Sequence, residues 1–239
     1  MKRYIVFVSI ICSCLQACQI EPADRPTRER YDAQAYASES ADGRVVFPLA
    51  MMETAFNIEA YQNASPEEKV QMTYIFNTLL THGNSCQMKN FHSFYMTTDG
   101  KSIYDPGAAW KISAHNNNHY TSYDTHLTLN CINEGDWCMT SEYDKGQIVF
   151  NISQLPSDGS LFFWNVELSG EIISDQGRVM KIYAPENLTR KVSVSEWGCM
   201  TSMEGTLHID VYDKDKVTLL DSYVYTFDGK ETENRYYQL

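Results

Sequence analysis

From about residue 90 onward the chain is built of strand-length segments separated by turn signals, and this pattern limits the fold more than any other feature. The segments are rich in Val, Ile, Tyr, Phe, Trp and Thr, as in QIVFNIS and GTLHIDVY, which favours β-strands. Asp-Gly pairs suit tight hairpin turns, and no helix-length pattern separates the segments, so parallel βαβ units are not expected. The sequence therefore predicts an antiparallel meander of about nine to eleven strands over residues 85–239, folded into a sandwich or a curled sheet.

Residues 47–84 carry the only helical patterns in the chain. Apolar residues recur there at helical spacing, first at Leu49, Met52, Phe56 and Ala60 and then at Met72, Ile75, Phe76 and Leu79. Ser65-Pro66-Glu67-Glu68 has the residues of a capping box at a helix start, and Gly83 suits a helix end. The sequence predicts a helical hairpin packed on the sheet, which makes the fold class α+β and β-dominated.

The N-terminus has the pattern of a signal peptide. Lys2 and Arg3 precede an apolar run, Tyr4 to Leu15, which is too short to cross a bilayer as a helix. The run ends in Leu15-Gln16-Ala17-Cys18, which resembles the lipobox of bacterial lipoproteins. The resemblance implies that residues 1–17 are removed and that Cys18 is acylated, which would anchor the protein in the bacterial cell envelope. The alternative is an ordinary secretory leader in which Cys18 has no role.

Two further features follow from the same resemblance. Gln16 departs from the lipobox pattern, in which a small or β-branched residue is more common at this position. Gln19 follows Cys18 where an Asp would disfavour onward sorting, so the outer membrane is the expected destination, with the domain on its periplasmic or cell-surface side.

Residues 18–46 are polar and contain proline, which predicts a flexible tether rather than a packed element. The alternative is an N-terminal strand that lies on the domain. Loss of Lys2 and Arg3 with the leader changes the formal net charge from −12 to −14, and no Lys/Arg cluster offsets it. Such a chain repels phosphate backbones, so nucleic acid is not an expected partner.

The stretch TTDGKSIYDPGAAWKI, residues 97–112, is the most unusual in the chain. Together with the leader it resembles uncharacterised β-rich lipoproteins of the Bacteroidetes, a resemblance that implies no particular activity. Gly100-Lys101-Ser102 is not a phosphate-binding loop, because Tyr95 stands where that motif has its first glycine. Gly100-Lys101-Ser102 is predicted to be part of a hairpin turn instead.

Four cysteines remain after the leader and Cys18 are set aside, namely Cys86, Cys131, Cys138 and Cys199. If residues 133–136 form a four-residue loop, Cys131 faces Cys138 at disulfide distance. Cys86 and Cys199 then form the second bridge by elimination. Buried reduced thiols are the alternative for all four.

The sequence gives no catalytic, cofactor or metal signature. His115, His119 and His126 are close in the chain, but Asn116-Asn117-Asn118 indicates a loop, in which their spacing fixes no ligand geometry. No Gly-x-Ser-x-Gly or His-Glu-x-x-His motif occurs, and acidic pairs such as Glu167 and Glu171 are unavoidable among 31 acidic residues.

Three functions remain compatible with the sequence. The first is a non-enzymatic envelope module that binds a glycan, a peptide or an envelope protein. Most aromatic rings are expected in the core, but Trp137 stands beside a turn and is the candidate for stacking on a ligand. The second is a periplasmic or surface hydrolase with a cleft that gathers carboxylates or a histidine. The third is a structural or assembly protein whose exposed strand edge pairs with another chain.

Overall fold

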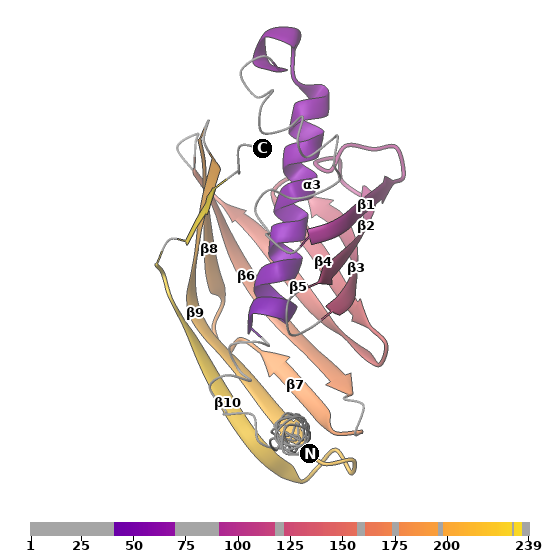
Figure 1. Ribbon diagram of the computed structural model, residues 1–239, viewed down its shortest axis with the longest axis vertical. Coiled ribbons are helices and arrows are strands. Elements are labelled where there is room, and N and C mark those ends of the chain that lie inside the picture. The colour runs from indigo at the N-terminus through magenta and orange to yellow at the C-terminus, as the bar shows by residue number, and fades with distance from the viewer. Residues whose placement is uncertain are drawn as a thin grey trace, which may run out of the picture.

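The structure is a computed structural model that describes residues 41–69, 91–117, 122–156, 161–173, 177–195, 198–230 and 232–235. Its elements are η2 (Asp42–Val46), α3 (Phe47–Asn63), β1 (Phe91–Thr98), β2 (Ala109–Asn117), β3 (Ser122–Asn133), β4 (Asp136–Tyr143), β5 (Gly146–Leu155), β6 (Leu161–Ile173), β7 (Val179–Tyr183), β8 (Leu188–Ser195), β9 (Gly198–Tyr212), β10 (Leu219–Asp228) and β11 (Thr232–Arg235). Figure 1 shows the strands curving round the helix.

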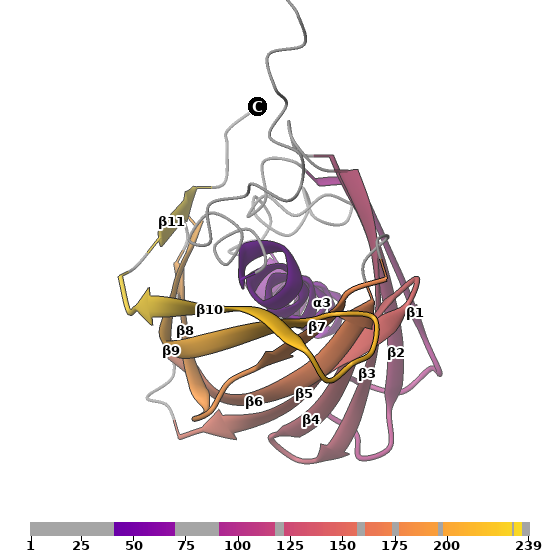
Figure 2. The ribbon, with the colours of Figure 1, turned by 90° about the horizontal axis from the view of Figure 1, so that it is seen from below.

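All eleven strands belong to one antiparallel sheet, so the predicted β-dominated class and antiparallel meander are confirmed. Strands β1 to β7 are neighbours in chain order, and β9 and β10 follow them. The sheet is curled rather than split into a sandwich, as Figure 2 shows in a view along the axis of α3. Strand β8 pairs with both β6 and β9, and β11 pairs with β9.

Strands β6 and β9 are the longest in the sheet, and each is shared by more than one neighbour along its length. Glycines stand in both strands close to where the neighbour changes from β8 to β7. A Cβ on Gly170 would lie 2.3 Å from the carbonyl oxygen of Gln147, and a Cβ on Gly205 would lie 2.6 Å from the side chain of Leu188. Gly205 also has φ +130°, which disfavours any residue with a side chain. The two glycines allow close strand contact where the sheet bends.

Helix α3 runs along the concave side of the sheet (Figures 1 and 2), and most of its described side chains are buried. Apolar residues of α3 and of the inward strand faces form one core, in which the Phe56 ring lies 5.1 Å from the Trp137 ring. The buried surface of α3 is therefore wider than the single apolar stripe predicted from the sequence. Glu53 and Glu59 are 2% and 4% exposed, whereas Ala60, predicted on the buried stripe, is exposed.

Only the first turn of the second predicted helix can be compared with the sequence. Residues 66–69 are helical, and the Ser65 N–H donates to Glu68 Oε2 at 2.8 Å. The Glu68 N–H donates back to Ser65 Oγ at 3.2 Å, which completes the predicted capping box. These bonds hold the pKa of Glu68 below its ordinary value. The rest of that helix, like the predicted leader and most of the tether, lies outside the described residues. The described end of the predicted tether, residues 41–46, is instead helical, and Ala41 and Val45 are buried in the core.

The buried carboxylates of α3 are bound by groups from the surrounding sheet and loops. Arg190 of β8 donates to Glu53 through Nε at 2.8 Å and through Nη2 at 3.0 Å, and both side chains are at most 3% exposed. One turn and a half further along α3, Glu59 accepts the N–H of Ile103 at 2.7 Å. A planar guanidinium facing a carboxylate gives two parallel bonds and fixes the orientation of both groups. These contacts orient α3 within the sheet.

Removing one member of the buried pair should destabilise the fold strongly. We expect Arg190→Met to lower the free energy of unfolding by about 3–5 kcal/mol, because Glu53 would remain as a buried charge without its counter-ion. The double variant Glu53→Leu/Arg190→Met should lose less than Arg190→Met alone. Urea denaturation measures both, with Glu171→Gln, which removes the exposed Lys216 contact, as a control worth less than about 1 kcal/mol. A loss below about 1 kcal/mol for Arg190→Met would contradict this account.

Candidate functional site

Strand β10 forms one margin of the sheet. Among the described strands it pairs only with β9, and it stands at the end of the strand order opposite to β1. Figure 1 shows it beside β9 at one side of the curled sheet. We call this margin the β10 edge, defined as the side of Leu219–Asp228 that faces away from β9.

The two faces of β10 differ in burial. Tyr223, Tyr225 and Phe227 point into the concave side, where Phe227 is buried and the two tyrosines pack against the core. The rings of Tyr225 and Phe227 meet edge to face at 4.9 Å. Val224 points to the convex side and is 56% exposed. The strand is therefore attached to the core by alternate residues, as a two-residue period requires.

The hydrogen-bond phase shows which main-chain groups face away from β9. The Gly229 N–H donates to the carbonyl of Met203 at 2.9 Å, in the same register as the rest of the β9–β10 pair. Because bonded and non-bonded pairs alternate in an antiparallel ladder, Tyr225 and Phe227 bond to β9. The N–H and C=O groups of Val224 and Thr226 then point outward at the β10 edge.

Between Asp221 and Asp228 the β10 edge has no Lys, Pro or bulge to stop it from pairing with another chain. Natural edges are commonly interrupted by Lys, Pro or a bulge. The register is irregular only between Leu219 and Asp221, and the eight residues from Asp221 to Asp228 pair continuously with β9 and include no Lys or Pro. At the start of this segment Asp221 Oδ1 accepts the N–H of Ser222 at 2.9 Å, so that outward donor is already satisfied.

Exposed apolar side chains gather at the start of β10 and in the turn before it. Val217 is 80% exposed, and Leu219 and Leu220 are 52% and 45% exposed. The opposite margin, β1, exposes one large apolar residue among its described side chains, Tyr95. An apolar cluster beside main-chain groups that point outward is typical of a surface that binds another chain.

The convex side of the β10 edge is acidic. Asp210 of β9 accepts hydrogen bonds from the Ser222 hydroxyl at 2.6 Å and from the Tyr183 hydroxyl at 3.1 Å. Burial, together with this bond to Asp210, raises the pKa of Tyr183. Asp228 lies directly opposite Glu204 and contacts Lys230, whose ammonium group lowers the pKa of the Asp228 carboxyl. Asp228 therefore stays ionised at neutral pH.

The structure contradicts the prediction that Trp137 stacks on a ligand. Its ring is 2% exposed, contacts Phe56 edge to face, and donates from Nε1 to the carbonyl of Ile103 at 3.0 Å. The strand register turns this side chain inward, which its position beside a turn did not reveal. Trp110 and Trp164 are also buried, at 3% and 5% exposure, and Trp197 lies outside the described residues.

The predicted bridge between Cys131 and Cys138 is also wrong, and both thiols are free. The register is irregular between Cys131 and Asn133, so Cys131 pairs with Trp137 and Cys138 pairs with Asn130. The two side chains consequently lie on opposite faces of the sheet. Burial, followed by the charges of Asp105 and Asp136, raises the pKa of the Cys131 thiol.

The remaining predicted cysteine sites cannot be compared with the structure. Cys18 and Cys86 lie outside the described residues, so neither the acylation site nor one half of the second bridge is placed. Cys199 lies in β9 and pairs with Asn234 of β11 along the backbone, but its side chain is outside the described part of the structure.

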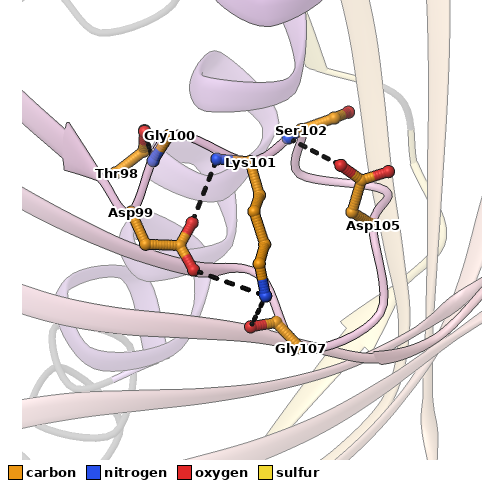
Figure 3. Close-up of polar contacts among 7 residues, drawn as sticks. All are labelled: Thr98, Asp99, Gly100, Lys101, Ser102, Asp105 and Gly107. Atoms are coloured by element: carbon orange, nitrogen blue, oxygen red, sulfur yellow. Dashed lines mark hydrogen bonds and ion pairs between the residues drawn. The ribbon is translucent and has the colours of Figure 1, made fainter.

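The unusual stretch between β1 and β2 is a connection between strands, as predicted, and its polar groups bind one another. Lys101 Nζ donates to the Gly107 carbonyl at 3.3 Å and lies 3.9 Å from Asp99 Oδ2 (Figure 3). The Asp105 carboxylate accepts the N–H of Ser102 at 3.1 Å (Figure 3). Between these contacts Ile103 is buried, with its main chain bound to α3 and to Trp137. The arrangement fastens α3 to the sheet.

The described residues give no support for a metal centre, since no group of three potential ligands gathers among them. His126 bonds to Ser113 at 3.0 Å, whereas His119 lies outside the described residues. Glu171 binds Lys216 at the surface instead of forming an enclosed acid pair with Glu167. No helix in the described part of the chain is long and apolar enough to cross a membrane.

Comparison with models of protein families, with curated proteins and with solved structures found no match for this chain.

Hydrogen exchange should show the outward phase of β10. We expect the amides of Val224 and Thr226 to exchange with water much faster than those of Tyr223 and Tyr225, because only the latter pair bond to β9. Exchange followed residue by residue by NMR measures this alternation. Equal protection of all four amides would show that another segment covers the edge, and a chain that begins at residue 41 would test whether the N-terminal residues are that segment.

Proposed function

We propose that this chain is a lipid-anchored module of the bacterial cell envelope that binds a partner polypeptide by strand addition at the β10 edge. The observation that carries the proposal is a continuous edge segment, Asp221–Asp228, without Lys or Pro and with outward main-chain groups at Val224 and Thr226. An extended segment added there would continue the antiparallel sheet by one strand.

The energetics of the β10 edge favour an extended peptide as ligand. Each new main-chain hydrogen bond contributes about 0.5–1.5 kcal/mol, and burial of apolar surface adds about 25 cal/mol per Å². The exposed Val224, Leu219 and Leu220 supply such surface next to the outward main-chain groups. A strand added to a formed sheet also needs less ordering of the receptor than a partner that must reshape a loop.

The other two candidate functions lack a comparable observation. A glycan site built on stacking needs exposed rings that face one ligand; Trp110, Trp137 and Trp164 are buried, and the exposed Tyr95 and Tyr104 stand on β1 and on the loop after it. A hydrolase needs an enclosed reactive group with its partner, and no such pair stands out among the described residues. The lipid anchor is proposed from the lipobox-like residues Leu15–Cys18 and the polar stretch behind them. Acyl chains would then hold the module at the membrane.

Binding should depend on the outward N–H of Val224. We expect random ten-residue peptides displayed on phage to yield ligands that bind the chain and lose at least about tenfold in affinity with Val224→Pro, because proline removes that donor and its ring blocks approach. Isothermal titration with the selected peptides measures the change. Val224→Thr keeps the donor and should bind within about threefold of the unchanged chain.

Two results separate this proposal from a loss of folding. Proline at 224 leaves the bonds to β9 in place, so the urea midpoint of Val224→Pro should stay close to that of the parent. Tyr225→Pro, whose N–H faces β9, should lower the midpoint instead. Strand addition would be contradicted if the selected ligands bound Val224→Pro with unchanged affinity, or if the library yielded no ligand.

The anchor has a separate test. We expect the intact chain to incorporate labelled palmitate in a lipoprotein-forming bacterium and to fractionate with membranes, whereas Cys18→Ser should do neither. Autoradiography and fractionation measure this, with Cys138→Ser as the matched control that keeps the label. Label that remains in Cys18→Ser would contradict acylation at this residue.

A further inference from the structure

We infer that the partner at the β10 edge is a basic extended segment, which aligns antiparallel to β10 with a Lys or Arg opposite Asp228 and an apolar residue opposite Val224. This inference rests on the proposed function and specifies the chemistry of its ligand. It follows from the charge of the edge, from the phase of the outward groups and from the contact that Lys230 makes.

The charge of the edge favours a cation. Strand β10 contains Asp221 and Asp228 and no Lys or Arg, and β9 adds Glu204 and Asp210 on the convex side. Asp228 and Glu204 are cross-strand neighbours, an arrangement in which like charges repel. A basic side chain on an added strand would lie beside Asp228, on the side away from Glu204, and its positive charge would offset that repulsion.

Lys230 shows that an ammonium group fits at this position. Its Nζ contacts Asp228, yet the Lys230 side chain is 84% exposed. An exposed lysine that holds its partner only at the surface is displaced at small cost. A Lys or Arg from an added strand would take the same contact, with the additional benefit of the main-chain bonds beside it.

The strand geometry sets the spacing of the ligand. Side chains on one face of a strand recur every second residue, so residues opposite Asp228 and Val224 are four positions apart on the convex face. Every strand pair in this sheet is antiparallel, and antiparallel ladders are the more stable kind. The recognised segment therefore reads, from its N-terminus, as a basic residue followed four positions later by an apolar one.

A second copy of this chain is a poorer occupant of the edge. Self-pairing would bring together two acidic strands on two bodies, each with a formal net charge of −12. Repulsion between the two copies opposes their association at low salt. The same negative charge attracts a basic partner and accelerates the encounter.

The test uses the full-length protein in a non-ionic detergent and three synthetic nine-residue peptides. Each has Thr at the odd positions and Thr, Val and Ser at positions 4, 6 and 8, while position 2 is Lys, Gln or Glu. We expect the Lys peptide to bind about tenfold tighter than the Glu peptide at low salt, with the Gln peptide between them. Raising the salt to about 0.5 M should reduce this preference to about twofold.

Variants locate the charge effect. Glu204→Gln/Asp228→Asn should remove most of the preference for the Lys peptide. The matched control Glu134→Gln/Glu142→Gln neutralises two exposed acids in β4 and in the turn before it, and it should keep the preference. Lys230→Gln should strengthen binding of the Lys peptide, because the competing ammonium is gone. Val224→Pro should weaken all three peptides alike, which separates pairing from charge recognition.

The outcomes distinguish the two proposals. If the three peptides bind equally and all depend on the Val224 N–H, strand addition stands and the basic partner is overturned. If the preference for Lys persists in Glu204→Gln/Asp228→Asn, the acidic edge is not its source and the inference also fails. If none of the peptides binds and phage selection also yields no ligand, the proposed function fails first. A dimer in sedimentation equilibrium that Val224→Lys dissociates would identify a second copy as the occupant and overturn the inference.

Discussion

The buried pair between Glu53 and Arg190 links the central helix to the sheet that surrounds it. Two charges can stay out of water only when each is met by the other with well-formed hydrogen bonds, which fixes how α3 and β8 face each other. Glu59 is held in the same way by the loop between β1 and β2. The two carboxylates can therefore be buried only if the sheet curls far enough to bring β8 and that loop to the helix.

The curl has a consequence for the margins of the sheet. A sheet that closes on itself has no edges, but here β1 and β10 end the strand order without meeting among the described strands. Strand β10 is held by β9 and by inward rings such as Phe227, so its other side needs nothing from the core. Because pairing surfaces of this kind invite aggregation, an edge without Lys or Pro is a cost unless it has a use.

Much of the fold could be predicted from the sequence because strands, turns and helix starts are local. The capping box of Ser65 and Glu68 depends on residues only three apart, and the antiparallel class follows from short connections. The errors arose where one residue of register decides the face. An irregular register between Cys131 and Asn133 pairs Trp137 with Cys131 on the core side and sends Cys138 to the other side of the sheet. Burial of Glu53 and Glu59 on α3 depends on a strand and a loop far away in the chain.

The β10 edge could not be found from sequence, because a strand is an edge only through its place in the sheet. Residues 85–239 are predicted as a meander of strands, yet the pattern of Leu219–Asp228 does not reveal which neighbour that strand has. Its acidity acquires a meaning only with that position, since the same aspartates on a central strand would be ordinary solvated groups. If the chain is anchored through Cys18 as we propose, a net charge of −14 would also repel the domain from an anionic membrane. That repulsion would leave the β10 edge accessible to a basic partner at the envelope.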